Sequence, residues 1–394
     1  MGRRSLPRNS FLTVRSQSPL VKWKKKWNDS LPDRPIQVSI RYTSYEKMSC
    51  PLTRPGKLYA EILLCLALVF LPGIAAARTP VNIIFDTDMG NDVDDALALA
   101  MLHAFENRHE ARLLAVTITK DNKWAAPYVD LVNTFYGRPE IPVGMVRNGK
   151  TPASDPLIQI PSERKNPDGS YVYPHKIRDG AEAQDAVMLL RKTLASQPDD
   201  SVVIVQVGFS TNLARLLETK ADNISALDGA SLIKKKARLL VVMAGNFSTG
   251  NPEFNLQQDV PSAQKVFSEW PTPIVDSGFE IGAAMLFPAS RIEHDFAYVK
   301  NHPVAEAYRS YKPMPYDRPT WDLTAVLYAV HPGNNYFSLS PPGKITVLPG
   351  GRSHFDASPD GRHRYLVLNE GQKLRTLEAM IMLASEPPEC IHCF

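Results

Sequence analysis

Five aspartates crowd into the stretch FDTDMGNDVDDALALA, directly after the apolar run at residues 81–85. They are Asp86, Asp88, Asp92, Asp94 and Asp95. Carboxylates at the end of a buried strand repel one another, and burial of an isolated charge costs free energy. We therefore expect a cation, a helix N-terminus or water to offset the repulsion. Carboxylates together with amide and backbone carbonyl oxygens form a hard oxygen cage, which suits Ca²⁺ or Mg²⁺ and not zinc.

The chemistry of such a cage would be hydrolytic. A divalent cation lowers the pKa of a bound water, and one carboxylate could then act as general base. An EF-hand is excluded because its ligand spacing and terminal Glu are missing. Capping of the following helix explains Asp94 and Asp95 as well as metal binding does. Capping does not explain Asp86, Asp88 and Asp92, so the stretch predicts a metal site.

The elements that must position these aspartates alternate along the chain. Buried-strand patterns rich in Val, Ile and Leu occur at 81–85, 111–119, 141–146, 201–208, 237–245 and 272–278. Helical patterns occur at 94–104, 124–137, 183–196, 211–218, 320–330 and 370–385. A polar loop is expected at 149–180 and a peripheral β-hairpin region at 337–368. This order predicts one large α/β domain, with a mainly parallel, Rossmann-like open sheet covered by helices.

Polar residues follow the later strands, at the sheet edge where ligands bind in open α/β folds. They are Thr211 and Asn212 after residues 201–208, and Asn246, Asn251, Glu253 and Asn255 after residues 237–245. Asp322 lies in the first turn of the helix expected at 320–330. We expect these residues to converge with the aspartates on one rim of the sheet. That convergence is the main functional signal in the sequence.

The stretch DTDMGNDVDDALAL resembles the amino-terminal motif of the nucleoside hydrolases, the inosine-uridine-preferring ribohydrolase superfamily. Other segments are similar to that family in the same order: GFSTNLARLL at 208–217, MAGNFSTGNPEFNLQQDVPSAQKVF at 243–267 and WDLTAVLYAV at 321–330. The resemblance covers most of residues 78–394 and implies the nucleoside hydrolase fold. It implies a metal-dependent N-glycosidase that hydrolyses ribonucleosides to base and ribose, by attack of a Ca²⁺-bound, Asp-activated water.

The resemblance also implies roles for individual residues. Asp88 corresponds to the aspartate that binds calcium and accepts the proton of the attacking water. The other implied metal ligands are Asp95, Asp322 and the backbone carbonyl of Thr211. Asp92 competes for a metal or ribose role, because residues 91–95 are two longer than the family's shorter motif. The implied ribose-binding residues are Asp94, Glu253 and Asn255, with Asn251 a looser match.

One departure from the family keeps other functions open. Some members place a His before the late Asp as leaving-group acid, whereas this sequence has Trp321. His175 is a candidate replacement, and Trp321 a candidate stacking surface for a base. A non-catalytic, calcium-dependent nucleoside- or sugar-binding protein is one alternative. A haloacid-dehalogenase-like phosphatase with Asp86 and Asp88 as its DxD motif is another, although it has no role for the segment at 253–255.

The amino-terminal region has its own signals. Residues 58–77, LYAEILLCLALVFLPGIAAA, follow the pattern of a secretory signal peptide cleaved after Ala77. Met48 lies where such a signal begins, so residues 1–57 are a basic, disordered extension or a start codon assigned too far upstream. The apolar core is too short for a comfortable membrane span. We expect an exported chain, periplasmic or extracellular, with no stable membrane anchor after cleavage.

Charge and cysteine content complete the sequence-based expectations. Residues 1–57 hold 13 Lys and Arg against three acidic residues, so residues 58–394 carry a net charge of −6 within a total of +4. This balance argues against a nucleic-acid partner. Cys390 and Cys393 are too isolated to indicate zinc, and a local disulfide or no role is expected. The family resemblance implies a homodimer or homotetramer, and the base preference between purine and pyrimidine is not readable.

Overall fold

A computed structural model describes residues 79–150 and 156–389, all within one compact unit, Ala75–Phe394. The predicted extension at 1–57, the signal peptide at 58–77, and Cys390 and Cys393 lie outside the described residues. None of the helices in the described ranges combines the length and apolar character that a membrane span requires.

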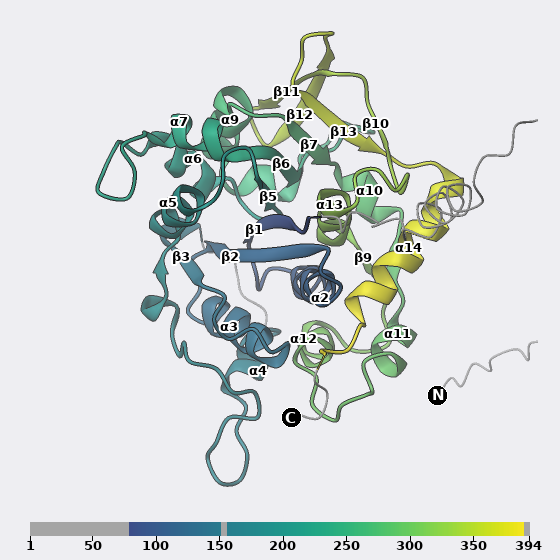
Figure 1. Ribbon diagram of the computed structural model, residues 1–394. Coiled ribbons are helices and arrows are strands. Elements are labelled where there is room, and N and C mark those ends of the chain that lie inside the picture. Colours follow the sequence, from purple (N-terminus) through teal and green to yellow (C-terminus); the bar gives the residue numbers. More distant parts are fainter. Residues whose placement is uncertain (1–78, 151–155, 390–394) are drawn as a thin grey trace, which may run out of the picture. The chain divides into compact units, whose positions relative to one another are not determined.

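The centre of the fold is an 11-stranded mixed sheet (Figure 1). Its strands lie in the order β4 (Gln184–Asp185), β3 (Val143–Lys150), β2 (Ala111–Lys120), β1 (Val81–Thr87), β5 (Val202–Gln206), β6 (Ala237–Met243), β7 (Ile274–Ser277), β13 (His363–Val367), β11 (Gly343–Leu348) and β12 (Arg352–Ala357). From β4 to β13 neighbouring strands are parallel. The hairpin β11–β12 and the short β10 (Ser338–Leu339) add antiparallel pairs. The predicted mainly parallel open sheet is confirmed.

The central strand β1 marks a change in the direction in which the sheet grows. β1 pairs with β2 on one side and with β5 on the other. The chain first moves outward through β2, β3 and β4, then returns to β5 and moves outward through β6 and β7. The segments that follow β1 and β5 therefore diverge and leave a crevice between them, where open α/β sheets bind ligands.

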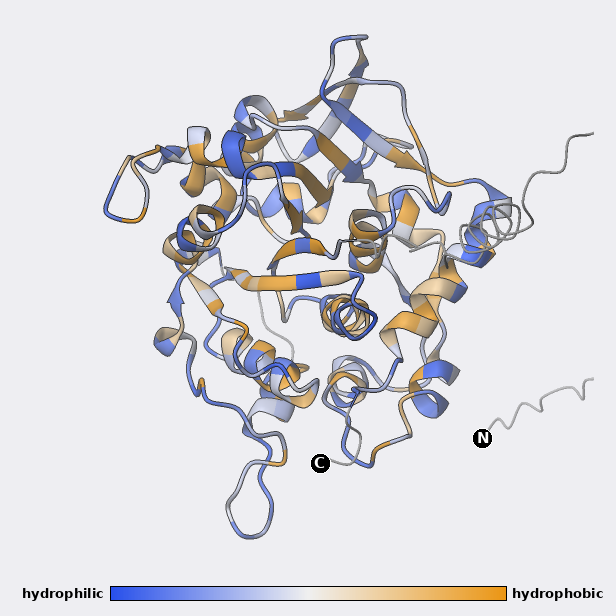
Figure 2. Cartoon of the chain, viewed as in Figure 1, coloured by the Kyte–Doolittle hydropathy of each residue, from blue (hydrophilic) through white to orange (hydrophobic). Residues whose placement is uncertain are grey.

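Helices cover both faces of the sheet because the side chains of each central strand point alternately to either face. Ile83 and Phe85 of β1 belong to one hydrophobic cluster and Ile84 to the other. The first cluster includes α2 (Asp94–Asn107), α3 (Ala125–Phe135), α12 (Pro303–Tyr311), α13 (Trp321–Val330) and α14 (Glu370–Ala384). The second includes α5 (Ala186–Ser196), α6 (Thr211–Glu218), α7 (Gly229–Lys236) and α9 (Val260–Glu269). Figure 2 shows mainly hydrophobic central strands and mainly hydrophilic outer loops.

Short elements connect these layers. They are α4 (Gln159–Glu163), the 3₁₀ turn Gly180–Glu182, α8 (Phe254–Gln258), α10 (Phe279–Ala283) and α11 (Ala289–His294), with a two-stranded sheet formed by β8 (Leu286–Phe287) and β9 (Arg318–Pro319). The sequence pattern did not predict them, because helices and strands this short have little periodicity.

Two expectations need correction. The region at 337–368 is not only a peripheral hairpin, because β13 pairs parallel with β7 and extends the main sheet. β13 is only partly buried, so it lacks the continuous apolar run that marks a parallel strand covered on both faces. The expected polar loop at 149–180 contains α4, which packs against α3 and α12.

Candidate active site

A cavity of about 310 Å³ is lined by residues that follow β1, β5 and β6 and by residues around the start of α13. Six of its lining residues are acidic: Asp88, Asp92, Asp94, Asp95, Glu253 and Asp322. Four are aromatic: Phe254, Phe279, Tyr311 and Trp321. Arg318 adds a positive charge. The predicted convergence on one rim of the sheet therefore holds for most of the polar residues that the sequence singled out.

The turn after β1 brings the two parts of the aspartate stretch to the same cavity. Gly90 has a φ of 104°, a conformation that residues with a Cβ rarely adopt. A Cβ at this position would also lie 2.4 Å from Cδ1 of Ile158. The chain can reverse here, so Asp88 at the end of the strand and Asp94 in the first turn of α2 both line the cavity.

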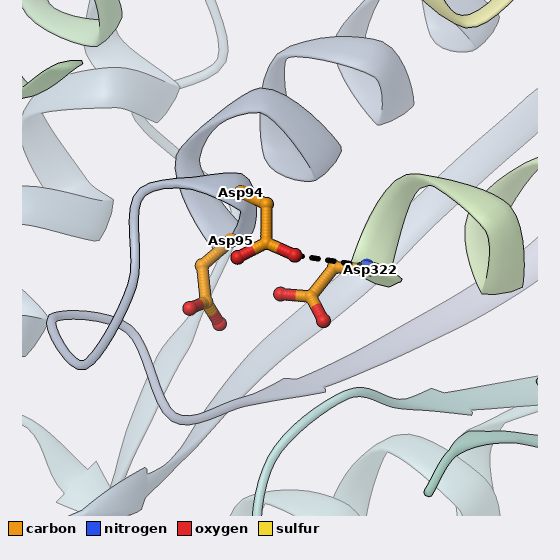
Figure 3. Close-up of side chains that lie close together, drawn as sticks. All are labelled: Asp94, Asp95 and Asp322. Carbon is orange, nitrogen blue, oxygen red and sulfur yellow. Dashed lines mark hydrogen bonds between the residues drawn. The ribbon is translucent and has the colours of Figure 1, made fainter. Parts of the chain in front are cut away.

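Asp94, Asp95 and Asp322 form a close group of carboxylates (Figure 3). One carboxylate oxygen from each lies within 4.8 Å of those of the other two, and all three residues are buried. Asp94 Oδ2 accepts a hydrogen bond of 3.2 Å from the backbone N–H of Asp322. Asp95 Oδ1 accepts one from the hydroxyl of Thr87. The first turns of α2 and α13 thus hold the three carboxylates together.

Burial and mutual repulsion control the ionisation of this group. Burial, and then the neighbouring carboxylates, raise the pKa values of Asp94, Asp95 and Asp322 well above those of ordinary aspartates. The carboxylate of Asp322 accepts no hydrogen bond from any residue in the described ranges, and it faces the cavity. A cation would let all three ionise, and a donor set made of oxygens alone fits Ca²⁺ or Mg²⁺.

Asp88 has hydrogen-bond partners that differ from those of the other three aspartates. Its Oδ2 accepts a hydrogen bond from the amide of Asn91. The side-chain carbonyl of Asn91 in turn accepts from the buried ammonium of Lys120, which also donates to the carbonyl of Gly90 at 3.1 Å. Burial raises the pKa of Asp88 to about 6, although the Asn91 hydrogen bond and the Lys120 charge oppose the rise. A carboxyl group tuned in this way suits a general base near neutral pH.

Glu253 and Asn255 are fixed by hydrogen bonds to the backbone. Glu253 caps α8 and accepts from the backbone N–H groups of Asn255, Leu256 and Gly245 at 2.9, 3.1 and 3.2 Å. Asn255 Nδ2 donates to the carbonyls of Val207 and Met243 at 2.9 and 3.1 Å. Burial raises the pKa of Glu253 to about 7, against the lowering by these N–H groups. Both side chains are preorganised in the cavity lining.

Three predicted site residues lie elsewhere or are engaged by other groups. Thr211 is not among the residues lining the cavity, and its hydroxyl donates to Asp259 at 2.6 Å. The segment at 208–210 separates it from the end of β5, and Val207 lines the cavity instead. Asn251 is exposed and is also not a lining residue. Asp92 does line the cavity, but both of its carboxylate oxygens accept hydrogen bonds from Arg318.

Close packing explains why position 208, shortly after β5, is a glycine. A Cβ at Gly208 would lie 2.5 Å from the backbone nitrogen of Asp88 and 2.4 Å from the hydroxyl of Thr119. Only glycine allows the two strand ends to approach so closely. Asn212, two positions after Ser210, donates to Asp86 Oδ1 at 2.9 Å and ties α6 to β1. The segment GFSTN therefore shapes the site through backbone packing.

The expectation that His175 replaces the missing leaving-group acid also needs correction. His175 is buried with its Nδ1 2.6 Å from the carbonyl of Tyr173, and it does not line the cavity. Trp321 does line it, with its indole N–H donating to the carbonyl of Phe279 at 3.0 Å. The sequence patterns did not indicate four further residues that line the cavity: Arg318, Tyr311, Phe254 and Phe279. Of these four, only Arg318 could have been found from the sequence, because it lies four positions before the predicted site residue Asp322.

A family model described as "Inosine-uridine preferring nucleoside hydrolase" matches residues 83–377. The chain belongs to this nucleoside hydrolase family. The match includes all the residues that line the cavity. A search of curated protein sequences gave no significant match.

Solved structures of two nucleoside hydrolases and of an effector protein share the fold. A purine-preferring ribonucleoside hydrolase from Gardnerella vaginalis is 20% identical, with a TM-score of 0.58, covering 77% of this chain and 98% of that one. An inosine-uridine preferring nucleoside hydrolase from Bacillus anthracis is 17% identical, with a TM-score of 0.57 and coverages of 77% and 99%. The type III effector protein XopQ, solved with adenosine diphosphate ribose, is 15% identical, with a TM-score of 0.56 and coverages of 84% and 98%.

Family membership identifies the chain as a nucleoside N-ribohydrolase, and the carboxylate cluster matches the metal dependence of this family. The phosphatase alternative fails on geometry as well. Asp86 is fully buried, accepts hydrogen bonds from Thr117 and Asn212 at 2.6 and 2.9 Å, and does not line the cavity. The first aspartate of a DxD phosphatase motif must reach the substrate, and Asp86 does not.

Proposed function

We propose that this nucleoside hydrolase is an exported, calcium-dependent enzyme in which Asp88 activates the attacking water. The observation that carries the proposal is one cavity that holds Asp88, the trio Asp94, Asp95 and Asp322, and the pair Glu253 and Asn255. Within the trio, Asp95 and Asp322 provide the cation site. Asp88 provides a base, and Asp94 and the pair provide groups that can bind sugar hydroxyls.

The metal we propose is Ca²⁺, held by Asp95 and Asp322, with Asp88 and Asp94 adjacent. Several closely spaced carboxylates suit its flexible coordination. When bound, the cation would offset the carboxylate repulsion and polarise a water and the ribose hydroxyls. Asp92 is not part of this proposed set because its carboxylate pairs with Arg318. Val207, and not Thr211, is the residue after β5 that lines the cavity.

The residues that line the cavity then have separate roles in hydrolysis. Asp94, Glu253 and Asn255 bind the ribose hydroxyls and fix C1′ relative to Asp88. As the C1′–N bond breaks, its electron pair passes to the base, and the buried carboxylates stabilise the positive charge that develops on the sugar ring. The water oxygen bonds to C1′, and its proton passes to the Asp88 carboxylate. Asn91 holds that carboxylate in place through its amide.

Export and assembly are proposed on separate grounds. The pattern at 58–77 supports cleavage after Ala77 and release to the periplasm or the exterior. The mass of the protein recovered from outside the cytoplasm tests this, with Arg78 expected as the first residue. The family resemblance supports a homodimer or homotetramer, and light scattering on the purified protein tests that assembly.

The experiment for the activity is an assay of ribose release from a panel of purine and pyrimidine nucleosides, with calcium and with chelator. We expect release from at least one nucleoside with calcium, and loss of release with chelator. The second candidate function is a nucleoside-binding protein without turnover, which Trp321 favours because it stands where some family members have their acid. Nucleoside binding by calorimetry with no ribose release would support that second function.

A further inference from the structure

Arg318 lines the proposed active site and is firmly anchored there. It lies on β9, which pairs with β8. Its Nε donates to Asp92 Oδ1 at 2.8 Å, and its Nη2 donates to Asp92 Oδ2. Nη2 also donates to the hydroxyl of Tyr311 at 3.1 Å. A bidentate pair of this kind fixes the plane of the guanidinium.

The anchoring leaves part of Arg318 available to a ligand. In the described ranges, Nη1 donates to no residue, whereas Nε and Nη2 are occupied. Arg318 is half-buried in a cavity that can hold a ligand. A cation whose remaining donors face a pocket can stabilise negative charge on a bound group.

The neighbours of Arg318 form a surface for a planar group. Its guanidinium carbon lies 5.1 Å from the ring centroids of both Tyr311 and Trp321. Phe279 lies beside Trp321, with a centroid distance of 5.4 Å. All these rings line the cavity. Aromatic rings beside a guanidinium suit a nucleobase, which can stack on the rings and accept hydrogen bonds at its edge.

We propose that Arg318, anchored by Asp92, stabilises the nucleobase as it leaves in anionic form, in place of the histidine acid that Trp321 replaces. This inference rests on the proposed function and deepens it. The C1′–N bond breaks with its electron pair on the base nitrogen, and Arg318 keeps its proton. The base anion takes a proton from solvent after it leaves. The water gives its oxygen to C1′ and its proton to Asp88, so no further reactant is needed.

The proposal also predicts the preferred class of base. A guanidinium donates well to a carbonyl oxygen beside a ring nitrogen, as it does to O6 and N7 of guanine. Bases with such an edge, the 6-oxopurines, should be preferred over adenine, whose amino group donates at the position of O6. The ribose-binding residues do not contribute to this preference.

A leaving-group comparison tests the proposal in the full chain with calcium present. The substrates are inosine, whose base needs stabilisation as it leaves, and 4-nitrophenyl β-D-ribofuranoside, whose phenolate leaves without help. Arg318→Gln should lower kcat/KM for inosine about 100-fold, the effect of losing one group that stabilises developing charge, and change it less than about fivefold for the aryl riboside. Arg309→Gln, at an exposed position on α12, is the matched control and should change neither.

Arg318→Lys and Asp92→Asn protect the test against misfolding of the first variant. Both should show the same selective loss, of about tenfold for inosine. Each variant keeps a positive charge at position 318 but loses the bidentate geometry of the Arg318–Asp92 pair. Equal losses on both substrates, or no loss on inosine, in all three variants would overturn the proposal. A wild-type chain that releases ribose from neither substrate would instead count against the proposed function itself.

Discussion

Asp94 and Asp322 are joined by a hydrogen bond from the backbone N–H of Asp322 to Asp94 Oδ2, across 228 positions of sequence. The bond connects the first turns of α2 and α13, and Asp95 follows directly in α2. It places three carboxylates near one point that none of the local motifs defines alone. The candidate metal site therefore depends on how α2 and α13 pack, and substitutions in the first turns of these helices can test it.

Replacement of Asp322 by Asn should weaken calcium binding while the fold is retained. Asn keeps the shape and the backbone N–H donor but removes one negative charge from the donor set. We expect calcium affinity to fall at least about tenfold, since even residues that only support metal ligands contribute that much. Isothermal calorimetry measures it. Asp356→Asn at an exposed position of β12 is the control, and equal affinity in both variants would place the metal elsewhere.

Stabilisation by calcium should be larger at pH 8 than at pH 5.5. The pKa values of Asp88 and Glu253 are raised to about 6 and about 7, and those of Asp94, Asp95 and Asp322 are also raised, well above those of ordinary aspartates. Without metal, the folded chain thus binds more protons than the unfolded chain between about pH 4 and 7, and its stability falls as pH rises through this window. Calcium replaces those protons.

The measurement for this prediction is the difference in Tm with calcium and with chelator at each pH. Taking the difference cancels the opposite contribution of buried histidines, such as His302, whose pKa burial lowers to about 3. A calcium-induced shift in Tm that is equal at both pH values, or larger at pH 5.5, would contradict the proposed linkage between carboxylate ionisation and metal binding.

Asp88→Asn should remove most of the turnover. Asn keeps the size of the side chain but cannot accept the proton of the attacking water. Loss of a general base costs about 10²- to 10⁴-fold in rate, so kcat should fall by that factor while KM changes much less. Initial rates of ribose release measure both constants. Activity within a few-fold of wild type would mean that another group is the base.

Lys120→Met should destabilise the fold and disturb Asn91. The buried ammonium donates to the carbonyl of Gly90 and to Asn91 in the turn that carries Asp88. Loss of a donor to buried polar groups costs about 1–3 kcal/mol in the free energy of unfolding. Urea denaturation measures it. Lys192→Met, at an exposed position of α5, should have almost no effect, and equal stability of the two variants would rule out this role for Lys120.

The sequence predicted the sheet, its main helices and the site residues that belong to local motifs. Asp88, Asp94 and Asp95 lie where a strand ends and a helix begins, and hydrophobic periodicity locates such junctions. Glu253 and Asn255 follow another strand end. The rule that ligands bind at the carboxyl ends of parallel strands then places these residues together.

The remaining features depend on contacts between distant segments. The pairing of Asp92 with Arg318 spans 226 positions, and no local pattern indicates that an arginine neutralises this charge. The motif predicts the backbone carbonyl of Thr211 at the cavity, because a motif gives the order of residues but not the length of turn that separates Thr211 from the strand end. His175 is buried by packing that its polar surrounding sequence does not predict.

We propose that the cavity hydrolyses nucleosides with a cation held by its carboxylates. Ribose release from a nucleoside panel by the chain beginning at Arg78, with calcium and then with chelator, tests it most directly. We expect release from at least one nucleoside with calcium, loss of release with chelator and recovery when calcium is restored. No release from any nucleoside in the presence of saturating calcium would contradict it.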